Sequence, residues 1–283
     1  DAREYSSNVT SGYMDSGWSG LTQASGEPAP QSAGTPESFT IEGLEPNTLY
    51  YFALKTIDDL YNSSAISNTV ATHTALKYGY NTIALPYNTS TGGAYTVGDI
   101  FGDDVPTVSM YKWQPSGLDS NGNFSGSWVM VNPATQISAL SNGAGYFLYA
   151  YQMNTSVLDE KNSSGATLVT GNTDNWVRVN LSRGRNLVGN PYLKNVDFAN
   201  IKICKNSTFS SSTGCGGGEV KTFVAAVAAG WLDGDILYYA NLTTYTSETC
   251  NAISCTARLR PWWGQWVYLL NGTDTYIMAV PKP

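Results

Sequence analysis

Residues 38–56 read SFTIEGLEPNTLYYFALKT, and this stretch decides the fold of the N-terminal part of the chain. Apolar and polar residues alternate on both sides of a Pro-Asn pair at positions 46 and 47. Such alternation is typical of half-buried strands, and a Pro-Asn pair between two strands indicates a turn. The stretch therefore predicts two antiparallel strands.

The residues in and around this stretch resemble those of a known domain family. The pattern L-x-P-x-T-x-Y-x-F at residues 44–52 resembles the corner between strands E and F of fibronectin type III domains, with Tyr50 as the tyrosine-corner residue. Residues 3–6 resemble strand C, and residues 64–70 resemble the approach to strand G and that strand itself. The resemblance implies a partial β-sandwich over residues 1–75, because nothing corresponding to strands A and B precedes strand C.

A sandwich without strands A and B has an unpaired edge. The strand predicted at Phe39–Leu44 would present that edge, with Phe39, Ile41 and Leu44 as its apolar residues. An unpaired strand edge is a template for the backbone of another chain. Either strands A and B lie upstream in a longer chain, or another subunit supplies them, and we expect the second. The partners would then be copies of this chain or a sister subunit.

The remainder of the chain contains an internal repeat. Residues 76–87 (LKYGYNTIALPY) and 181–192 (LSRGRNLVGNPY) align without gaps and share Leu, Gly, Asn, Pro and Tyr at the same positions. A second pair follows, GYFLY at 145–149 and GQWVY at 264–268. These motifs are similar to the "GWNLISLP…GYW" repeats that follow fibronectin type III domains in secreted prokaryotic surface proteins.

Together these patterns predict an all-β chain. Strand-favouring aromatic residues are abundant, with 19 Tyr and 8 Trp. We expect the partial sandwich at 1–75, one β-repeat unit at 76–155 and a second at 156–283. Further strands are expected at Val108–Trp113, Ser127–Val131 and Asp235–Ala240, and one short helix at Glu219–Ala229.

Four cysteines occur near the C-terminus, and they allow three pairings. We favour disulfides Cys204–Cys215 and Cys250–Cys255, because each closes a short polar loop. A metal site built from the four thiolates is the alternative, although the spacing differs from the paired C-x-x-C of zinc ribbons. Disulfides imply an oxidising compartment, and hence an extracellular or cell-surface protein.

Glycosylation is the second indication of an external location. Ten N-x-S/T acceptor motifs occur, roughly twice the number that chance predicts in so Asn-, Ser- and Thr-rich a chain. A polar surface without glycans is the alternative. The candidate sites are Asn8, Asn62, Asn88, Asn123, Asn154, Asn162, Asn180, Asn206, Asn241 and Asn271.

The net charge and the distribution of apolar residues limit the kinds of partner that we expect for this chain. The net charge is −7, so no basic face is expected to attract nucleic acid. No apolar run approaches the roughly 20 residues of a membrane-spanning helix. Glycans remain candidate partners, because exposed aromatic rings stack on sugars. The aromatic candidates are Trp113, Trp128, Trp176, Trp231, Trp262, Trp263 and Trp266; we expect most of them in the core and Trp262-Trp263 as the best exposed pair.

Few residues of the sequence occur in patterns that are typical of catalytic sites. The one histidine, His73, has no nucleophile motif beside it, and the Asp pairs stand where turns explain them. No cofactor is expected; calcium is a candidate at Asp99, Asp103 and Asp104 or at Asp233 and Asp235. We therefore expect no enzyme but an extracellular structural subunit of a filament, pilus-like fibre or surface layer, joined by strand complementation. The alternative is an adhesive or carbohydrate-binding module of a larger secreted protein.

Overall fold

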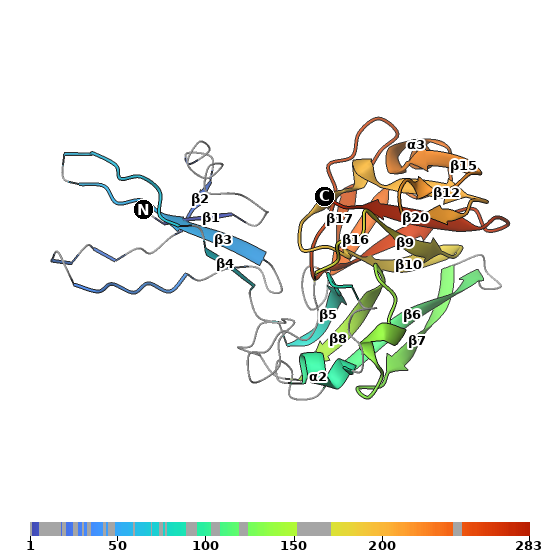
Figure 1. The fold of residues 1–283 in the computed structure, drawn as a ribbon, viewed down its shortest axis with the longest axis horizontal. Coiled ribbons are helices and arrows are strands. Elements are labelled where there is room, and N and C mark those ends of the chain that lie inside the picture. Colours follow the sequence, from blue (N-terminus) through green and yellow to red (C-terminus); the bar gives the residue numbers. More distant parts are fainter. Residues whose placement is uncertain are drawn as a thin grey trace. The chain divides into compact units, whose positions relative to one another are not determined.

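Antiparallel strands dominate the structure. The computed structural model describes residues 2–5, 18, 21–24, 28–29, 31–32, 35–41, 44, 49–58, 60–68, 70–73, 76, 78–88, 95–102, 108–118, 124–151, 171–239 and 245–283. This described part contains many strands and two short α-helices, so the fold is all-β, as predicted. The chain divides into two compact units, Asp1–Ala75 and Leu76–Pro283 (Figure 1).

The first unit contains a four-stranded antiparallel sheet with the strand order β2-β1-β3-β4. The register pairs Glu4 with Phe52 and Phe52 with Val70. The stretches that the fibronectin resemblance assigns to strands C and F are therefore neighbours. The four strands are β1 (Ala2–Tyr5), β2 (Thr22–Gln23), β3 (Leu49–Leu54) and β4 (Val70–His73).

The two faces of β3 are unequally covered. On one face Ala53 is only 2% exposed, and it packs with half-buried Tyr51 against Leu21. On the other face Tyr50 is buried, Phe52 is half-buried and Leu54 is 56% exposed. Successive side chains of a strand point to opposite faces. One face of β3 therefore belongs to a small core, and on the other face exposure among the described residues increases from Tyr50 to Leu54.

The strand expected at Phe39–Leu44 is not formed. Residues 35–41 and Leu44 belong to no strand, and Phe39, Ile41 and Leu44 are half-buried. A strand needs a neighbour that exchanges backbone hydrogen bonds with it. Among the described residues of the first unit, none pairs with this stretch. Within this chain the described residues Phe39, Ile41 and Leu44 therefore join no sheet, and their role as an edge that another subunit pairs with stays a prediction.

The second unit contains two four-stranded antiparallel sheets with one common plan. The strand order is β5-β8-β6-β7 in the first sheet and β10-β19-β16-β17 in the second. The first sheet consists of β5 (Gly79–Ala84), β8 (Gly145–Ala150), β6 (Ser109–Leu118) and β7 (Phe124–Val131). The second consists of β10 (Gly184–Gly189), β19 (Gly264–Leu269), β16 (Asp235–Tyr239) and β17 (Tyr245–Thr249).

Equivalent residues of the two sheets make equivalent contacts. The Nδ2 groups of Asn81 and Asn186 each donate a hydrogen bond, both at 3.0 Å, to the carbonyl of the glycine two residues earlier. Those glycines, Gly79 and Gly184, have φ angles of 96° and 97°, a left-handed conformation that favours glycine. The common strand order and these matching turns are what the internal repeat predicts.

The two sheets contact each other through equivalent strand ends. The amide of Ala84 donates to the carbonyl of Trp262 at 3.0 Å, and the amide of Gly189 donates to the carbonyl of Gly143 at 2.8 Å. In the repeat, Ala84 corresponds to Gly189, and Gly143 corresponds to Trp262. The two hydrogen bonds are therefore equivalent, and we call them the reciprocal crossing. The backbones approach closely here, since a Cβ built on Gly189 would lie 2.3 Å from the Cβ of Ala84. The crossing places both sheets in one compact unit.

A third sheet, with the order β15-β12-β20-β9, completes the second unit. It shares a hydrophobic core with the second sheet, in which Val188, Phe198 and Met278 are fully buried. The remaining strands are β15 (Glu219–Thr222), β12 (Lys202–Lys205), β20 (Tyr276–Pro281) and β9 (Trp176–Leu181), with the pairs β11 (Val196–Asp197) and β18 (Arg258–Leu259), and β13 (Phe209–Ser210) and β14 (Gly214–Cys215).

Short helical elements lie between these strands. They are α2 (Val97–Phe101), η3 (Ile137–Ala139), η4 (Phe198–Asn200) and α3 (Phe223–Ala228). The helix predicted at Glu219–Ala229 therefore begins later than expected, because residues 219–222 pair with β12 as strand β15. The Oγ1 of Thr222 accepts the hydrogen bond that caps α3, and Gly230 with φ 69° follows its end.

Two disulfides stabilise this region. Cys204 of β12 is bonded to Cys215 of β14, and Cys250 is bonded to Cys255. These are the two pairings that loop closure favours in the sequence.

Candidate functional site

Three of the eight tryptophans are buried, four are half-buried and one is exposed. Trp231, Trp262 and Trp266 are buried, and Trp128 is 43% exposed. The prediction that Trp262 and Trp263 form an exposed pair is wrong, because Trp262 is only 2% exposed. Its backbone has φ 64°, and its ring lies 5.1 Å from that of Tyr87 in the core of the first sheet. Trp263 is half-buried beside it.

Tyrosines form the open aromatic surface. Tyr80 of β5 lies opposite Tyr149 of β8, with ring centroids 4.8 Å apart. Tyr151 follows at 4.7 Å from Tyr149, and Tyr78 lies at 6.2 Å from it. Tyr78, Tyr80 and Tyr151 are between 47% and 52% exposed. We call these four residues the tyrosine face.

Hydrogen bonds hold the hydroxyl groups of the tyrosine face in place. The hydroxyls of Tyr151 and Ser109 lie 3.2 Å apart. A hydrogen bond with Tyr78 raises the pKa of Tyr149 above its ordinary value, with smaller contributions from desolvation and the adjacent tyrosines. The rings therefore support one another, while their hydroxyls remain near the solvent.

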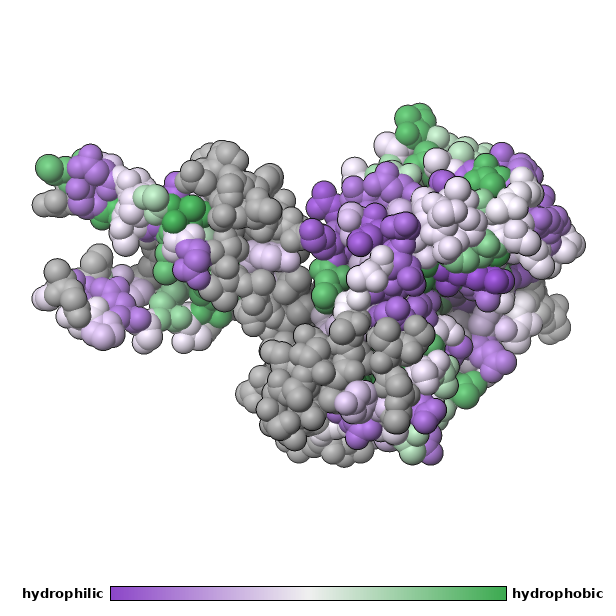
Figure 2. Space-filling model, viewed as in Figure 1, coloured by the Kyte–Doolittle hydropathy of each residue, from purple (hydrophilic) through white to green (hydrophobic). Residues whose placement is uncertain are grey.

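The tyrosine face continues into the contact between the two sheets. Phe147 lies 5.8 Å from Tyr80 and 4.6 Å from Trp128. Trp128 in turn lies 5.9 Å from Trp266 of the second sheet. Phe147 and Trp266 of this aromatic row are buried, whereas the tyrosines at its other end are exposed or half-buried. On the visible side of the second unit, hydrophilic and hydrophobic residues are intermixed (Figure 2).

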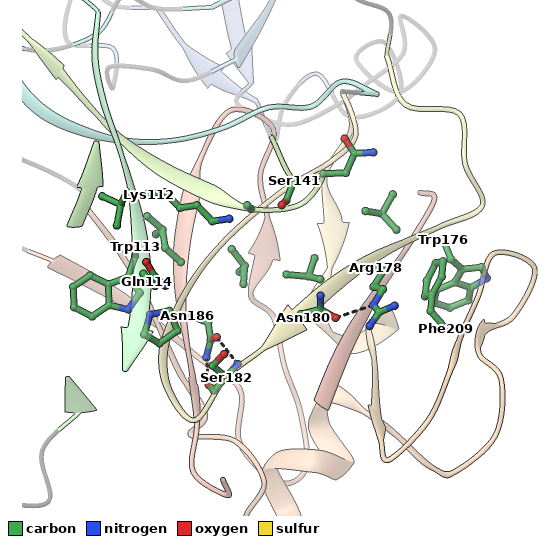
Figure 3. A pocket seen from close by; sticks show the side chains of 18 of the residues that line it. Lys112, Trp113, Gln114, Ser141, Trp176, Arg178, Asn180, Ser182, Asn186 and Phe209 are labelled. Atoms are coloured by element: carbon green, nitrogen blue, oxygen red, sulfur yellow. Dashed lines mark hydrogen bonds between the residues drawn. The ribbon is translucent and has the colours of Figure 1, made fainter. Parts of the chain in front are cut away.

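A cleft of about 630 Å³ lies elsewhere in the second unit, between β6 and β9 (Figure 3). In β9, Val177, Val179 and Leu181 are buried, so the residues between them face outward. Arg178 and Asn180 consequently line one wall of the cleft, and Lys112 of β6 lines another. Trp176 and Phe209 stand at one end.

One hydrogen bond orients the arginine of this cleft. The Nε of Arg178 donates to the Oδ1 of Asn180 at 2.7 Å. In the described part of the chain, neither Arg178 nor Lys112 forms an ion pair with a carboxylate. Both side chains are exposed, and Asp174 is the one carboxylate in the described lining. The cleft is therefore locally cationic in a chain of net charge −7.

The candidate glycosylation sites differ in accessibility. Asn62, Asn180 and Asn206 are exposed, and Asn88 and Asn271 are half-buried. The other five candidates lie outside the described residues: Asn8, Asn123, Asn154, Asn162 and Asn241.

The carboxylates considered for catalysis or calcium make local contacts. Asp99 accepts hydrogen bonds from the amide and hydroxyl of Thr96, and these bonds lower its pKa. Asp233 accepts from the amide of Asp235, which accepts from Thr249. Asp103 and Asp104 lie outside the described residues. Across the described ranges, no group of three or more His, Cys, Asp or Glu side chains is placed to hold a metal ion.

Sequence reasoning missed the tyrosine face and the cleft. A signal for the first exists, because the repeat has Tyr78 and Tyr80 where its second copy has Arg183 and Arg185. The cleft has no comparable signal, since its walls come from strands far apart in the chain.

No protein-family model matches this chain, and neither the curated proteins nor the solved structures include one that is similar to it. The candidate sites are therefore interpreted from their own chemistry.

None of the helices in the described ranges has the length and apolar character of a membrane span.

Proposed function

We propose that this chain is a glycan-binding, adhesive part of an extracellular protein and that the tyrosine face is its binding surface. The observation that carries this proposal is the exposure of Tyr78, Tyr80 and Tyr151 around Tyr149. A sugar ring has an apolar face of C–H groups and an edge of hydroxyls. Tyrosine has a matching apolar ring and a polar tip.

The arrangement favours binding for a second reason. Immobilising a side chain on binding costs about 0.5–1.5 kcal/mol. The rings of the tyrosine face already contact one another, and the hydroxyl of Tyr151 already interacts with Ser109. Little additional order is therefore needed when a ligand binds. Two disulfides and the glycosylation motifs support an extracellular location.

Glycan arrays followed by calorimetry test this proposal. Tyr80→Ala and Tyr149→Ala should each weaken glycan binding about tenfold or more, as truncation of a central aromatic contact does. Tyr95→Ala is the matched control, because Tyr95 is similarly exposed but lies just before α2. Glycan binding that is absent, or that survives both face variants, would contradict the proposal.

A second candidate function is a structural subunit of a filament or surface layer that other chains complete by strand addition. It is favoured by the exposure of Leu54 at the end of β3, which is 56%, and by residues 35–41, which join no strand among the described residues. Apolar surface and free backbone groups together are what an added strand would cover.

Electron microscopy tests the second candidate. Native material should contain fibres or sheets, and Leu54→Asp should abolish them by placing a charge on the covered face. Leu60→Asp is the control, since Leu60 is 76% exposed and lies outside β3. Dispersed single particles at high protein concentration would argue against a structural role.

A further inference from the structure

The cleft between β6 and β9 presents a combination of groups that differs from the tyrosine face. Lys112 of β6 is paired with Tyr146 of β8, and Tyr146 lies three positions before Tyr149, so Lys112 and Tyr149 point to opposite faces of the sheet. None of the four residues of the tyrosine face lines the cleft, so the cleft is a separate surface. The cleft volume of about 630 Å³ falls within the range of about 300–1,000 Å³ that is usual for ligand sites.

The charge of the residues that line the cleft indicates the kind of ligand that it binds. Arg178 and Lys112 bring two positive charges to the lining, against the single carboxylate of Asp174 among the described lining residues. In a chain of net charge −7, two cations without a carboxylate partner among the described residues favour an anion.

The orientation of Arg178 is the second clue. Its Nε is engaged with Asn180 at 2.7 Å, which fixes the plane of the guanidinium. The edge formed by the two Nη groups has no hydrogen-bond partner among the described residues. Two parallel N–H groups on such an edge match the two oxygens of a carboxylate.

The uncharged residues of the lining indicate which other groups the ligand carries. Gln114, Ser141 and Ser182 offer amide and hydroxyl groups that pair with sugar hydroxyls, and Val129 and Trp176 offer apolar contact. We propose that the cleft binds an acidic sugar oligomer, with the carboxylate of one hexuronate unit held by the Nη edge of Arg178 and Lys112 as a second cation of the lining. This inference concerns a second site and does not depend on the tyrosine face.

Asn180 connects this site with glycosylation. Its side chain lies in the cleft wall, and it begins one of the N-x-S/T motifs. A glycan attached there would occupy the cleft, so attachment and ligand binding exclude each other. The test therefore uses the full chain produced in a host that does not attach N-linked glycans.

Calorimetry with oligogalacturonate and neutral galactose oligomers of the same length tests the proposal. The acidic oligomer should bind at least tenfold more tightly, and binding should weaken as salt is raised. Arg178→Gln and Lys112→Gln should each weaken it about tenfold. Asn180→Asp should do the same, because it gives Arg178 an internal carboxylate partner. Lys194→Gln, the same charge change at an exposed residue outside the cleft, should have no effect.

The outcomes separate the two proposed sites. Acidic binding that is lost in the cleft variants but retained in Tyr80→Ala supports the cleft site. Equal affinity for neutral and acidic oligomers, absence of binding to the acidic oligomer, or equal loss in Lys194→Gln overturns it. Acidic binding that is lost in Tyr80→Ala but retained in the cleft variants would leave the tyrosine face as the binding surface and overturn the cleft proposal. Thermal melts of each variant establish that the fold is retained.

Discussion

The substitution Gly189→Ala tests the packing of the two repeats directly. A Cβ at position 189 would lie 2.3 Å from the Cβ of Ala84 and 2.8 Å from the carbonyl oxygen of Ala144. Neither neighbour is the end of a flexible side chain, so the added methyl group can be accommodated only if the backbones at the reciprocal crossing separate. Such a separation would also weaken the hydrogen bond from the Gly189 amide to Gly143.

The expected effect is a moderate loss of stability. Overpacking of this kind costs about 1–3 kcal/mol, and backbone contacts place Gly189→Ala near the upper end. Replacing a strand glycine by alanine recovers about 0.5–1 kcal/mol of conformational entropy. The net loss is therefore about 2 kcal/mol. For a unit of roughly 200 residues this corresponds to a fall in Tm of about 4–8 °C.

Differential scanning calorimetry measures this loss, and a second substitution identifies its cause. Ala84→Gly removes the nearest methyl group, so the double variant should recover part of the stability that Gly189→Ala loses. Gly171→Ala is the control, since its closest contact at 3.0 Å is the flexible end of Leu193. An unchanged Tm for Gly189→Ala, or a double variant that recovers nothing, would refute the close approach of the two backbones.

Three further predictions concern other parts of the chain. Replacing Cys204 and Cys215 together by serine removes a cross-link that spans 11 residues and should cost about 2–4 kcal/mol in chemical denaturation, so an unchanged midpoint would contradict a stabilising role. Trp262→Ala empties a core position and should cost about 3–5 kcal/mol; a loss under about 1 kcal/mol would be inconsistent with its burial. Hydrogen bonds from Asn206 and Lys205 lower the pKa of Asp274, so this carboxylate adds stability above about pH 4 that is lost as the pH falls through its lowered pKa. Asp274→Asn should accordingly melt below the unaltered protein near neutral pH, and the gap should close on acidification rather than widen.

Local patterns in the sequence were sufficient for much of the second unit. The shared Gly and Asn of the two repeat motifs indicate one turn geometry, and Asn81 and Asn186 make the same hydrogen bond. Alternation identifies β6 as a strand for a related reason, since its residues from Tyr111 to Ser116 alternate between half-buried and exposed. Such features depend on residues close together in the chain, which is why the sequence alone reveals them.

Other features depend on partners that a local pattern does not contain. The apolar alternation at Phe39 and Ile41 satisfies the rule for a strand, yet a strand also requires a neighbour with which to pair. The Glu219–Thr222 segment becomes a strand because β12 lies beside it. Trp262 is buried because the reciprocal crossing directs it into the core of the other repeat. The exposure of the tyrosine face likewise depends on a distant partner, since Phe147 is buried against Trp266 of the second sheet whereas Tyr149, two residues later, is half-buried.

The reciprocal crossing also limits how this chain can assemble into something larger. An interface in which two partners present the same surface to each other is isologous and closed, because its formation leaves no further copy of that surface available. Here both partners belong to one chain, so β5 and β10 each find their counterpart within the molecule. The second unit is in this respect an internal dimer. Any open-ended, head-to-tail growth must therefore use other surfaces, such as the first unit or the outer strands β7 and β17.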